Sequence, residues 1–325
     1  MHIGRAPAVL VLALACAVHP AAPQPAAKVY RVGVLEAVPS AQNAANLEAL
    51  RRGLADLGYA EGRNLVIVYR SADGHAERFP ELAAELASQK VDVIVTRGTP
   101  ATNAARNAAG AIPVVMATMG DPRAIVQSYA RPGGNVTGLT TFSTELSAKR
   151  VELLKELVPT LSRVALLHNM ANPAVPAEWE ETKAAARALG IEAELLDVRA
   201  SGALPGAFAE ASQHHAGAIV VGADGLMQAN RQVVVDLAAR YRLPAIYPDR
   251  EFVEAGGLAT YAVSFPDMYY RFAAYIDKIL RGVKPAEIPV EQPMRLELVL
   301  NARTAKALAI AIPQSLLVRA SEVLH

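Results

Sequence analysis

The residues best placed to bind a small charged molecule follow a predicted strand at the point where a helix begins. Arg97-Gly98-Thr99 closely follows the predicted strand Val91–Val95, and Gly98-Thr99 opens a predicted helix through Asn107. The N–H groups and the positive end of such a helix favour a carboxylate or another anion, and glycine lets a ligand approach the backbone. Thr99 can also simply cap its helix, a role that is compatible with ligand binding.

Other polar and aromatic residues occupy equivalent positions after predicted strands. The full set of candidate ligand-contacting residues is Glu36, Ala37, Gly98, Thr99, Met119, Gly120, Asp121, Asn169, Asp224, Tyr247, Asp249 and Tyr261. Asp224 either fixes a ligand amine or caps the helix beyond Gly225, and Asp121 is interpreted first as a helix cap. Tyr247 and Tyr261 either stack on a ligand or pack as ordinary apolar residues.

No pattern in the sequence points to catalysis or to a tightly bound cofactor. The chain has no P-loop, dinucleotide-binding fingerprint, HExxH or GxSxG motif. Its single cysteine, Cys16, lies in the N-terminal segment, so no thiol nucleophile follows. His214 and His215 are adjacent and diverge by about 100° on a helix, which is unfavourable for sharing a metal. We therefore expect no catalytic residues, no metal site and no cofactor.

Composition bounds the class of protein and its partners. The chain has 325 residues, of which 52% are hydrophobic and 19% charged, and its formal net charge is +1. This length favours two domains, because single cores stop growing at about 250–300 residues. Without a strong basic field, we expect no nucleic-acid partner. The expected partner is a small molecule, and nothing in the sequence predicts an oligomer, so we expect a monomer.

The N-terminus has the pattern of an export signal. Arg5 precedes an apolar run over Ala8–Val18, and a Pro- and Ala-rich stretch follows before order is expected at Lys28. A short basic region, an apolar core of about 7–15 residues and a small-residue exit are typical of a secretory signal peptide. We expect residues 1–27 to be that signal and the protein to be periplasmic. Ala13-Leu14-Ala15-Cys16 resembles a lipoprotein processing box, so Cys16 is a candidate lipid anchor.

Short apolar runs alternate with helical patterns almost without interruption after residue 28. The expected strands include Tyr30–Leu35, Val91–Val95, Val164–Leu167 and Ala218–Val221. The expected helices include one on the spacing of Leu47, Leu50 and Leu54, one from Asp121-Pro122 through Ala130 and one near Met227–Tyr241. Continuous apolar strands separated by helices indicate parallel sheets covered on both faces. Two such series predict an α/β fold with two Rossmann-like lobes. The expected N-terminal lobe covers 28–142, with about 264–285 returning to it, and the C-terminal lobe covers 143–263. Residues 286–325 are expected to form a crossover and C-terminal helices.

Ligands of open parallel α/β sheets bind outside the carboxyl ends of the strands, near the point where the strand order reverses. Two such sheets facing each other would form one cleft lined by loops from both lobes. The candidate residues given above come from those loops, which is the reason for grouping residues so far apart in the sequence.

Several stretches resemble the ABC transporter substrate-binding protein family, which includes members described as binding tryptophan and other aromatic amino acids. The resemblance is carried by Arg51–Tyr59, Val91–Ala101, Gly120–Pro122, Arg131–Gly138, Lys149–Lys155, Pro244–Gly257, Ala274–Lys284, Thr304–Leu308 and Ile312-Pro313. It implies the type 1 periplasmic-binding-protein fold, in which three crossing segments form a hinge. We place the crossings at Thr141–Glu145, Val263–Asp267 and Gly282–Glu291.

The resemblance also implies a function. An extracytoplasmic protein of this kind captures a small molecule between two lobes, with an amino acid as the candidate ligand here, and delivers it to ABC permease subunits in the inner membrane. Asn169 and Asp224 match typical ligand positions of the family. The first loop departs from it, because relatives often have small polar residues where this chain has Glu36, which argues against simple carboxylate binding there.

Three other functions fit the same lobes. A periplasmic ligand sensor would feed a signalling receptor, and no residue separates it from a transport protein. A gene regulator should carry an N-terminal DNA-binding helix pair, where this chain has a signal-like segment. A periplasmic enzyme would need a catalytic constellation that the sequence does not show.

Overall fold

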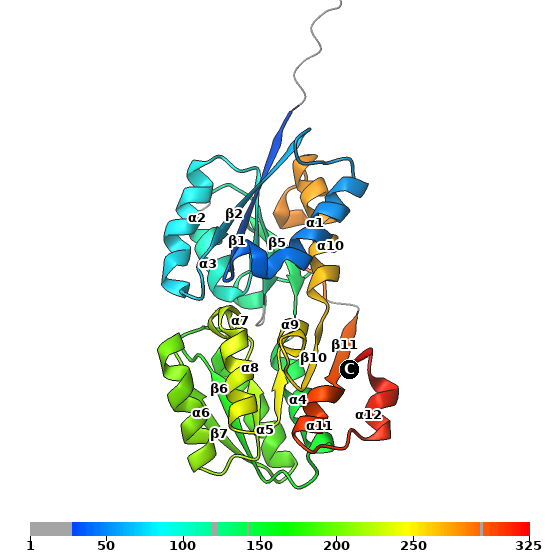
Figure 1. Ribbon diagram of the computed structural model, residues 1–325. Helices are drawn as coiled ribbons and strands as arrows, with labels where there is room; N and C mark the ends of the chain where they lie inside the picture. Colours follow the sequence, from blue (N-terminus) through cyan, green and yellow to red (C-terminus); the bar gives the residue numbers. More distant parts are fainter. Residues whose placement is uncertain (1–27, 109, 119–121, 142, 293–294) are drawn as a thin grey trace, which may run out of the picture.

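The computed structural model consists of two α/β lobes stacked end to end, and the carboxyl ends of their central strands face each other (Figure 1). The structure describes residues 28–108, 110–118, 122–141, 143–292 and 295–325. The predicted signal segment 1–27, with Cys16, lies outside these ranges. The predicted fold class, two Rossmann-like lobes with parallel sheets, is confirmed. Among the described residues, no helix combines the length and apolarity that crossing a membrane requires.

The first lobe is built on a five-stranded, fully parallel sheet in the order β2-β1-β3-β4-β5. Its strands are β1 (Tyr30–Glu36), β2 (Leu65–Ser71), β3 (Val93–Arg97), β4 (Val114–Thr118) and β5 (Val136–Thr140). Its helices are α1 (Ala44–Asp56), α2 (Phe79–Ser88), α3 (Thr99–Ala108) and, from much later in the chain, α10 (Phe265–Leu280). Short 3-10 turns are η1 (Ser40–Asn43), η2 (Ala76–Arg78), η3 (Pro122–Ala124) and η5 (Pro285–Glu287).

The second lobe repeats the strand order and then extends it. Its sheet runs β12-β11-β10-β9-β8-β6-β7, so β7-β6-β8-β9-β10 corresponds to the order of the first lobe. The strands are β6 (Arg163–His168), β7 (Glu192–Asp197), β8 (Ala218–Val221), β9 (Ala245–Tyr247), β10 (Ala259–Val263), β11 (Leu296–Asn301) and β12 (Glu322–Leu324). The helices are α4 (Ser143–Leu157), α5 (Val175–Ala188), α6 (Leu204–Gln213), α7 (Gly225–Ala229), α8 (Arg231–Arg240), α9 (Arg250–Glu254), α11 (Ala302–Ala307) and α12 (Gln314–Arg319), with the 3-10 turn η4 (Ser201–Ala203).

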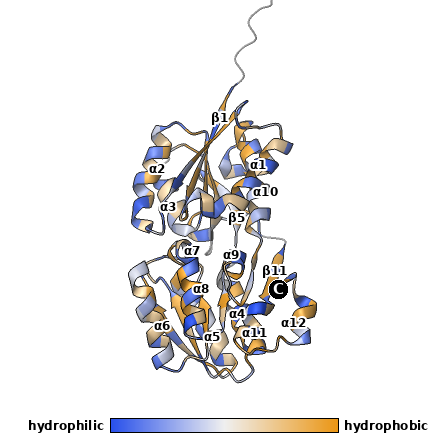
Figure 2. Cartoon of the chain, viewed as in Figure 1, coloured by the Kyte–Doolittle hydropathy of each residue, from blue (hydrophilic) through white to orange (hydrophobic). Residues whose placement is uncertain are grey.

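Both faces of each sheet are covered, which explains why the strands are continuously apolar. In β1, Val32 and Val34 pack into the core beneath α1 and α10, whereas Leu35 packs beneath α2 and α3. Side chains of a strand alternate between faces, so a strand covered on both sides needs apolar residues at successive positions. Figure 2 shows the same arrangement, with hydrophobic strands inside and hydrophilic residues on the outer sides of the helices.

Helices α1 and α10 pack closely because a glycine lies at their contact. A Cβ atom on Gly53 of α1 would lie only 2.5 Å from the carbonyl oxygen of Tyr270 and 2.9 Å from Cβ of Ala273, both on α10. This contact attaches α10 to the first lobe, although the strand that precedes it, β10, belongs to the second.

The chain passes between the lobes three times: between β5 and α4, between β10 and α10, and between Glu291 and β11. The third crossing is later than the predicted Gly282–Glu291. The segment before it lies along β5, because Thr137 Oγ1 donates to the carbonyl of Ile288 (2.6 Å) and Glu291 exchanges backbone hydrogen bonds with β5. Residues 288–291, which were expected to belong to the crossover, therefore lie along the β5 edge of the first sheet.

Three further sequence expectations differ from the structure. Beyond Pro122 the chain forms only the turn η3, instead of a helix through residue 130, because Gln127 N donates to the carbonyl of Pro132 and reverses the chain. The helix expected over 227–241 is two helices, α7 and α8, which meet at Asn230. The sheet of the second lobe is not wholly parallel, since β11 pairs antiparallel with β10.

Candidate ligand-binding cleft

The strand-end loops of the two lobes meet at one interface. Glu36 ends β1 and His168 ends β6, and each of these strands lies where the strand order of its sheet reverses. This is the position at which open α/β sheets bind ligands. Loops after β3, β8 and β9 join the same interface through Gly98, Asp224 and Asp249.

Arg97, at the end of β3, joins the lobes electrostatically. Its Nη2 lies 3.1 Å from Oδ2 of Asp249 and its Nη1 lies 3.6 Å from Oε1 of Glu251, both in the second lobe. The guanidinium also stacks 3.6 Å from the ring centroid of Phe265. Only 8% of the Arg97 side chain is exposed, so the pairing takes place away from solvent, where charges interact more strongly.

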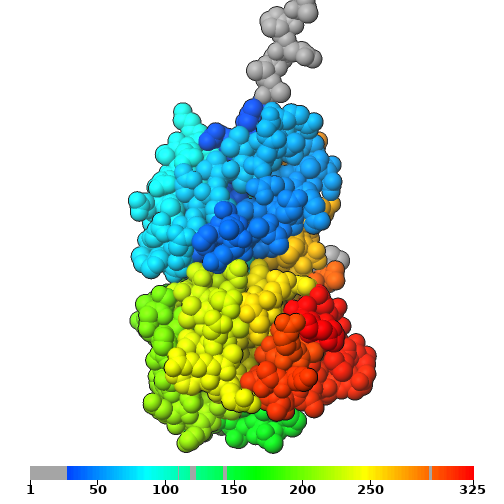
Figure 3. Space-filling view, viewed as in Figure 1, coloured from blue at the N-terminus to red at the C-terminus, as the bar shows by residue number. Residues whose placement is uncertain are grey.

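Two glycines allow the lobes to touch. A Cβ atom on Gly225, the first residue of α7, would lie 2.7 Å from Cβ of Ala37, and one on Gly74 would lie 2.9 Å from Cβ of Ala229. At the outer edge, Arg231 Nη1 donates to Oε1 of Gln42 (2.8 Å). Figure 3 shows the two lobes meeting along a seam on this face. The structure therefore presents the closed arrangement.

Two adjoining cavities of about 30 Å³ each remain between the closed lobes. The first, here the apolar cavity, is lined by Ala37, Gly74, Ala76, Phe79, Arg97, Gly98, Pro100, Asn169, Asp224, Gly225 and Leu226. The second, here the acidic cavity, is lined by Glu36, Ala37, Arg97, Gly98, Asp224, Gly225, Gln228, Asp249 and Phe265. Each has about the room that one or two water molecules need, so a larger guest would require the lobes to separate slightly.

Asp224 organises the second-lobe side of the cleft. Its carboxylate accepts hydrogen bonds from Leu226 N (2.8 Å), which caps α7, from Asn172 Nδ2 (2.7 Å) and from Asn169 Nδ2 (3.2 Å). Burial raises the pKa of Asp224, and these bonds oppose that rise by favouring the ionised form. Asp224 therefore caps α7 and lines the cleft at the same time.

Glu36 is completely buried at the end of β1. Asn43 Nδ2 donates to its Oε1 (3.2 Å), while Arg97 lies near enough to stabilise its charge. Burial dominates and raises the pKa of Glu36 to about 7. The Glu36 carboxyl is therefore partly protonated near neutral pH.

His168 lies directly behind Asp224 and is also buried. Burial lowers its pKa to about 4, so the imidazole is neutral at neutral pH. Neither ring nitrogen has a hydrogen-bond partner within the described part of the chain. A Cβ atom at Gly222 would lie 2.1 Å from Nδ1 of His168, so only glycine fits beside the ring.

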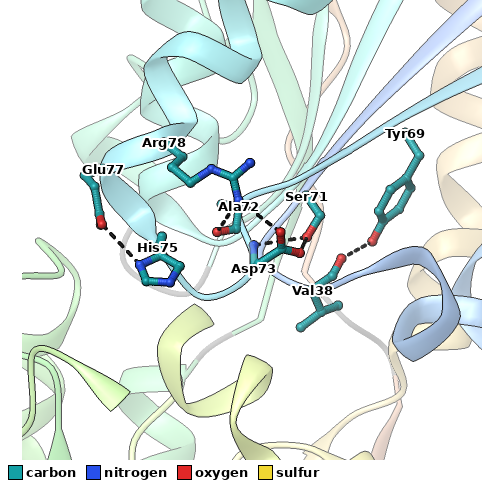
Figure 4. A network of polar contacts seen from close by, with 8 residues as sticks. All are labelled: Val38, Tyr69, Ser71, Ala72, Asp73, His75, Glu77 and Arg78. Carbon is teal, nitrogen blue, oxygen red and sulfur yellow. Dashed lines mark hydrogen bonds and ion pairs between the residues drawn. The ribbon is translucent and has the colours of Figure 1, made fainter. Parts of the chain in front are cut away.

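A polar network orders the loops that follow β1 and β2 at the rim of the cleft, and Figure 4 shows its members. Tyr69 donates from its hydroxyl to the carbonyl of Val38 (2.6 Å), which ties the two loops together. Ser71 Oγ donates to Asp73 Oδ1 (2.6 Å), and Arg78 Nη1 donates to Asp73 Oδ2 (3.0 Å). This network holds Gly74 against α7.

An internal ion pair, which the sequence did not reveal, supports the loops of the second lobe. Arg150 Nη1 lies 3.8 Å from Glu178 Oε1, and Ser147 Oγ donates to the same oxygen (2.6 Å). Arg150 also donates to the carbonyls of Tyr261 (3.0 Å) and Pro248 (3.5 Å). The pair therefore braces the loop that carries the neighbouring Asp249. Lys149–Lys155 is one of the segments that resemble the family, but the sequence alone does not show which residue forms an ion pair with Arg150.

Most candidate residues lie at the interface, and some do not. Glu36, Ala37, Gly98, Asn169, Asp224 and Asp249 line the cavities, and Thr99 begins α3 beside them. Met119, Gly120 and Asp121 lie outside the described residues. Tyr247 is in the core of the second lobe, where its ring stacks on Phe252 at 5.1 Å, so it does not face the cleft. Tyr261 packs between the cores of both lobes near the second crossing.

The sequence also missed a group of potential metal ligands away from the cleft. Glu194, Glu210 and His214 each offer a ligand atom, and these atoms lie within 4.8 Å of one another. Glu210 and His214 are four residues apart at the end of α6, a spacing that places them on one helix face. The sequence pairs His214 with its neighbour His215, whereas in the fold His214 lies beside Glu194 and Glu210.

Comparisons with known proteins agree with this geometry. Residues 31–324 match the family described as ABC transporter substrate binding protein. The Tyrosine-binding protein of Clostridioides difficile strain R20291 is 26% identical over 259 residues, which cover 79% of this chain and 74% of that protein. The structure of an ABC domain in complex with L-Trp from Streptococcus pneumonia has a TM-score of 0.84 and 27% identity, and the match covers 91% of this chain and 100% of the other.

A more distant structure shows the fold alone. The periplasmic binding protein/LacI transcriptional regulator from Alkaliphilus metalliredigens has a TM-score of 0.55 at 14% identity, with 82% of this chain and 96% of the other covered. The two-lobed architecture is thus that of type 1 periplasmic binding proteins. The matched family consists of solute-binding proteins, not enzymes, in agreement with the expectation from the sequence. From its match over nearly the whole described chain, this protein belongs to the ABC transporter substrate-binding protein family.

Proposed function

We propose that this protein captures an amino acid with an apolar, aromatic side chain between its two lobes and presents it to an ABC importer. The observation that carries the proposal is the pair of adjoining cavities between the lobes, both of which are lined by Arg97 and Asp224. Phe79, Pro100 and Leu226 add apolar wall to one cavity, and Glu36 and Asp249 add carboxyl groups to the other. A free amino acid has the same division into an apolar side chain and a charged backbone.

The apolar cavity suits the side chain. Phe79, Pro100 and Leu226 contribute to its wall from both lobes, and Phe79 supplies an aromatic ring. Ligand sites are mostly apolar with a few polar groups that fix orientation. Opening of the lobes by a small angle would enlarge this space to fit an indole or phenol ring.

The charged groups suit the amino acid backbone. Asp224, which lines both cavities, is placed to accept hydrogen bonds from an ammonium group. The positive end of α3, which begins at Thr99 beside Gly98, is the counterpart for a carboxylate. The relatives described as binding tyrosine and L-Trp support an aromatic amino acid as the ligand class.

Closure provides the connection to transport. Arg97, Asp249 and the contacts at Gly225 join the lobes only when they are closed, so ligand-driven closure would create a distinct surface for permease subunits. The signal-like segment at residues 1–27, with the lipid-anchor candidate Cys16, supports delivery outside the cytoplasm, in the periplasm. We further propose that the protein acts as a monomer.

The direct test is calorimetric titration of the purified protein with L-tryptophan, L-tyrosine and L-phenylalanine, with D-ribose as a control sugar. We expect at least one aromatic amino acid to bind with one-to-one stoichiometry and to raise the melting temperature. At 100 times its dissociation constant, a ligand stabilises the folded state by about 2.7 kcal/mol. Binding of ribose but of none of the three amino acids would refute the proposed ligand class.

A further inference from the structure

Two buried side-chain oxygens, both on residues that line the acidic cavity, have no hydrogen-bond partner among the described residues. Oε2 of Glu36 and Oε1 of Gln228 are both buried, and neither has a hydrogen-bond partner among the residues that the structure describes. The Glu36 side chain is fully buried and Gln228 is 5% exposed. Buried acceptors are rarely left unpaired, since each has lost its bonds to water.

The charges around this cavity are also unbalanced. Glu36, Asp224 and Asp249 all line it, against one cationic side chain, Arg97. Arg97 is already engaged by Asp249 and Glu251 and is stacked on Phe265, so it has little capacity left for the carboxylate of a ligand.

We infer that the cleft recognises its ligand chiefly through a protonated amine held between Glu36, Gln228 and Asp224, and that the ligand's carboxylate is dispensable. This inference rests on the proposed function and narrows it: aromatic amines should bind as well as the corresponding amino acids. The amine lies in the acidic cavity, and the aromatic body lies in the adjoining apolar cavity.

The two cavities share the lining residues that this placement requires. Ala37, Gly98, Asp224 and Gly225 belong to both, so one short molecule can extend from one cavity into the other. The ammonium offers three donors, which matches the two unpaired oxygens and one oxygen of Asp224. The counterpart for a carboxylate is weaker, because a helix N-terminus provides only a partial charge.

The acid–base state of Glu36 supports the same assignment. Burial raises its pKa to about 7, which means that no neighbouring cation in the described structure fully compensates its charge. A cationic group arriving beside Oε2 would favour the ionised form. Glu36 is therefore the specificity-determining residue of this inference.

The test is a calorimetric comparison of three compounds that share one ring: tryptamine, L-tryptophan and indole-3-propionate, with the tyrosine series (tyramine, L-tyrosine and 3-(4-hydroxyphenyl)propionate) run in parallel. We expect the amine to bind within about tenfold of its amino acid and the propionate to show no measurable binding. If the amino acid binds and the amine does not, this inference is wrong while the proposed function stands. If no compound of either series binds, and L-phenylalanine does not bind either, both are wrong.

A substitution at Glu36 tests whether the amine of the ligand binds there. Glu36→Gln keeps the size of the side chain and an acceptor for Asn43 while removing the charge, and it should weaken amine binding at least tenfold. The matched control is Glu48→Gln, the same substitution at an exposed residue of α1 that lines neither cavity. Melting curves confirm that both variants fold. Equal amine affinity in the wild type and E36Q would overturn the role of Glu36.

Discussion

Asp224 caps α7 and, in the proposed function, also attracts the ammonium group of the ligand; a single substitution can separate these two roles. As the N-cap of α7 it needs only an acceptor oxygen, whereas attraction of a ligand ammonium needs its negative charge. Asn169 and Asn172 hold the carboxylate in place and leave it on the lining of both cavities. The same residue therefore links the order of the second lobe to its chemistry.

Asp224→Asn should preserve the cap and lose the charge. Because hydrogen bonds to charged groups contribute about 1.5–3 kcal/mol, we expect the affinity for an amino acid or amine to fall by at least tenfold. Titration calorimetry measures the change, and Asp236→Asn on the outer side of α8 is the control with the same substitution. An affinity equal to that of the wild type would remove the loop after β8 from the site.

His168 gives the second lobe a defined response to acid. Its pKa is lowered to about 4 in the folded protein, against 6.5 for an ordinary histidine, so only the unfolded chain binds a proton between these values. The contribution of His168 to stability is therefore complete above pH 6.5 and is lost as pH falls towards 4. The loss is on the order of 3 kcal/mol. Asp224, Arg150 and Asp197 face the ring and modify the value.

This prediction is checked by urea unfolding between pH 4 and 7 in the wild type and in His168→Gln. Glu36 and Asp249 have raised pKa values, so they act in the opposite direction, and the difference between the two proteins isolates the histidine. The wild type should lose more stability on acidification than H168Q. Parallel curves for both proteins would contradict the buried neutral imidazole.

At the scale of elements, the contact between α1 and α10 fixes the second and third crossings to the first lobe. Gly53→Ala adds a methyl group within 2.5 Å of the carbonyl of Tyr270, so the helices must separate even though alanine favours a helix. We expect the free energy of unfolding to fall by about 1–3 kcal/mol. Gly206→Ala is the matched control, because this glycine is also in a helix and has open space around its Cβ position.

Denaturant unfolding of both variants measures the effect. The control should be as stable as the wild type or slightly more stable. If G53A were equally stable, the close packing of α1 on α10 would be incorrect.

The elements also show what sequence can and cannot predict. The apolar runs of β1, β3, β6 and β8 and the spacing of Leu47, Leu50 and Leu54 in α1 predicted their elements, because local periodicity reports burial directly. The position of the third crossing was wrong, because pairing of Ile288–Glu291 with β5 depends on residues about 150 positions earlier.

The candidate site was predictable to the level of loops. The rule that ligands bind at strand ends located Gly98, Asn169 and Asp224, since chain order fixes where parallel strands end. It failed for Tyr247, because the direction of a side chain at a strand end depends on the neighbour it packs against, here Phe252. It also gave no sign that Arg97 pairs with Asp249 across the lobes, since local spacing does not show which loops of the two lobes meet.

At the level of the whole molecule, closure of the two lobes should depend on the small residues at their interface. Gly225→Ala places a methyl group 2.7 Å from Cβ of Ala37 in the opposite lobe, while each lobe by itself keeps its core. We expect the melting temperature of the ligand-free protein to stay the same and L-tryptophan to bind at least tenfold more weakly. Gly202→Ala, with open space and no contact to the other lobe, is the control. Wild-type affinity in G225A would show that binding does not need full closure.

Hydrogen–deuterium exchange with and without saturating L-tryptophan tests whether one ligand contacts both lobes at once. Bound L-tryptophan should slow amide exchange both in the first-lobe loops around residues 36–40 and 97–102 and in the second-lobe loops around 222–230 and 247–252. Protection confined to one lobe, or appearing only outside these loops, would contradict it.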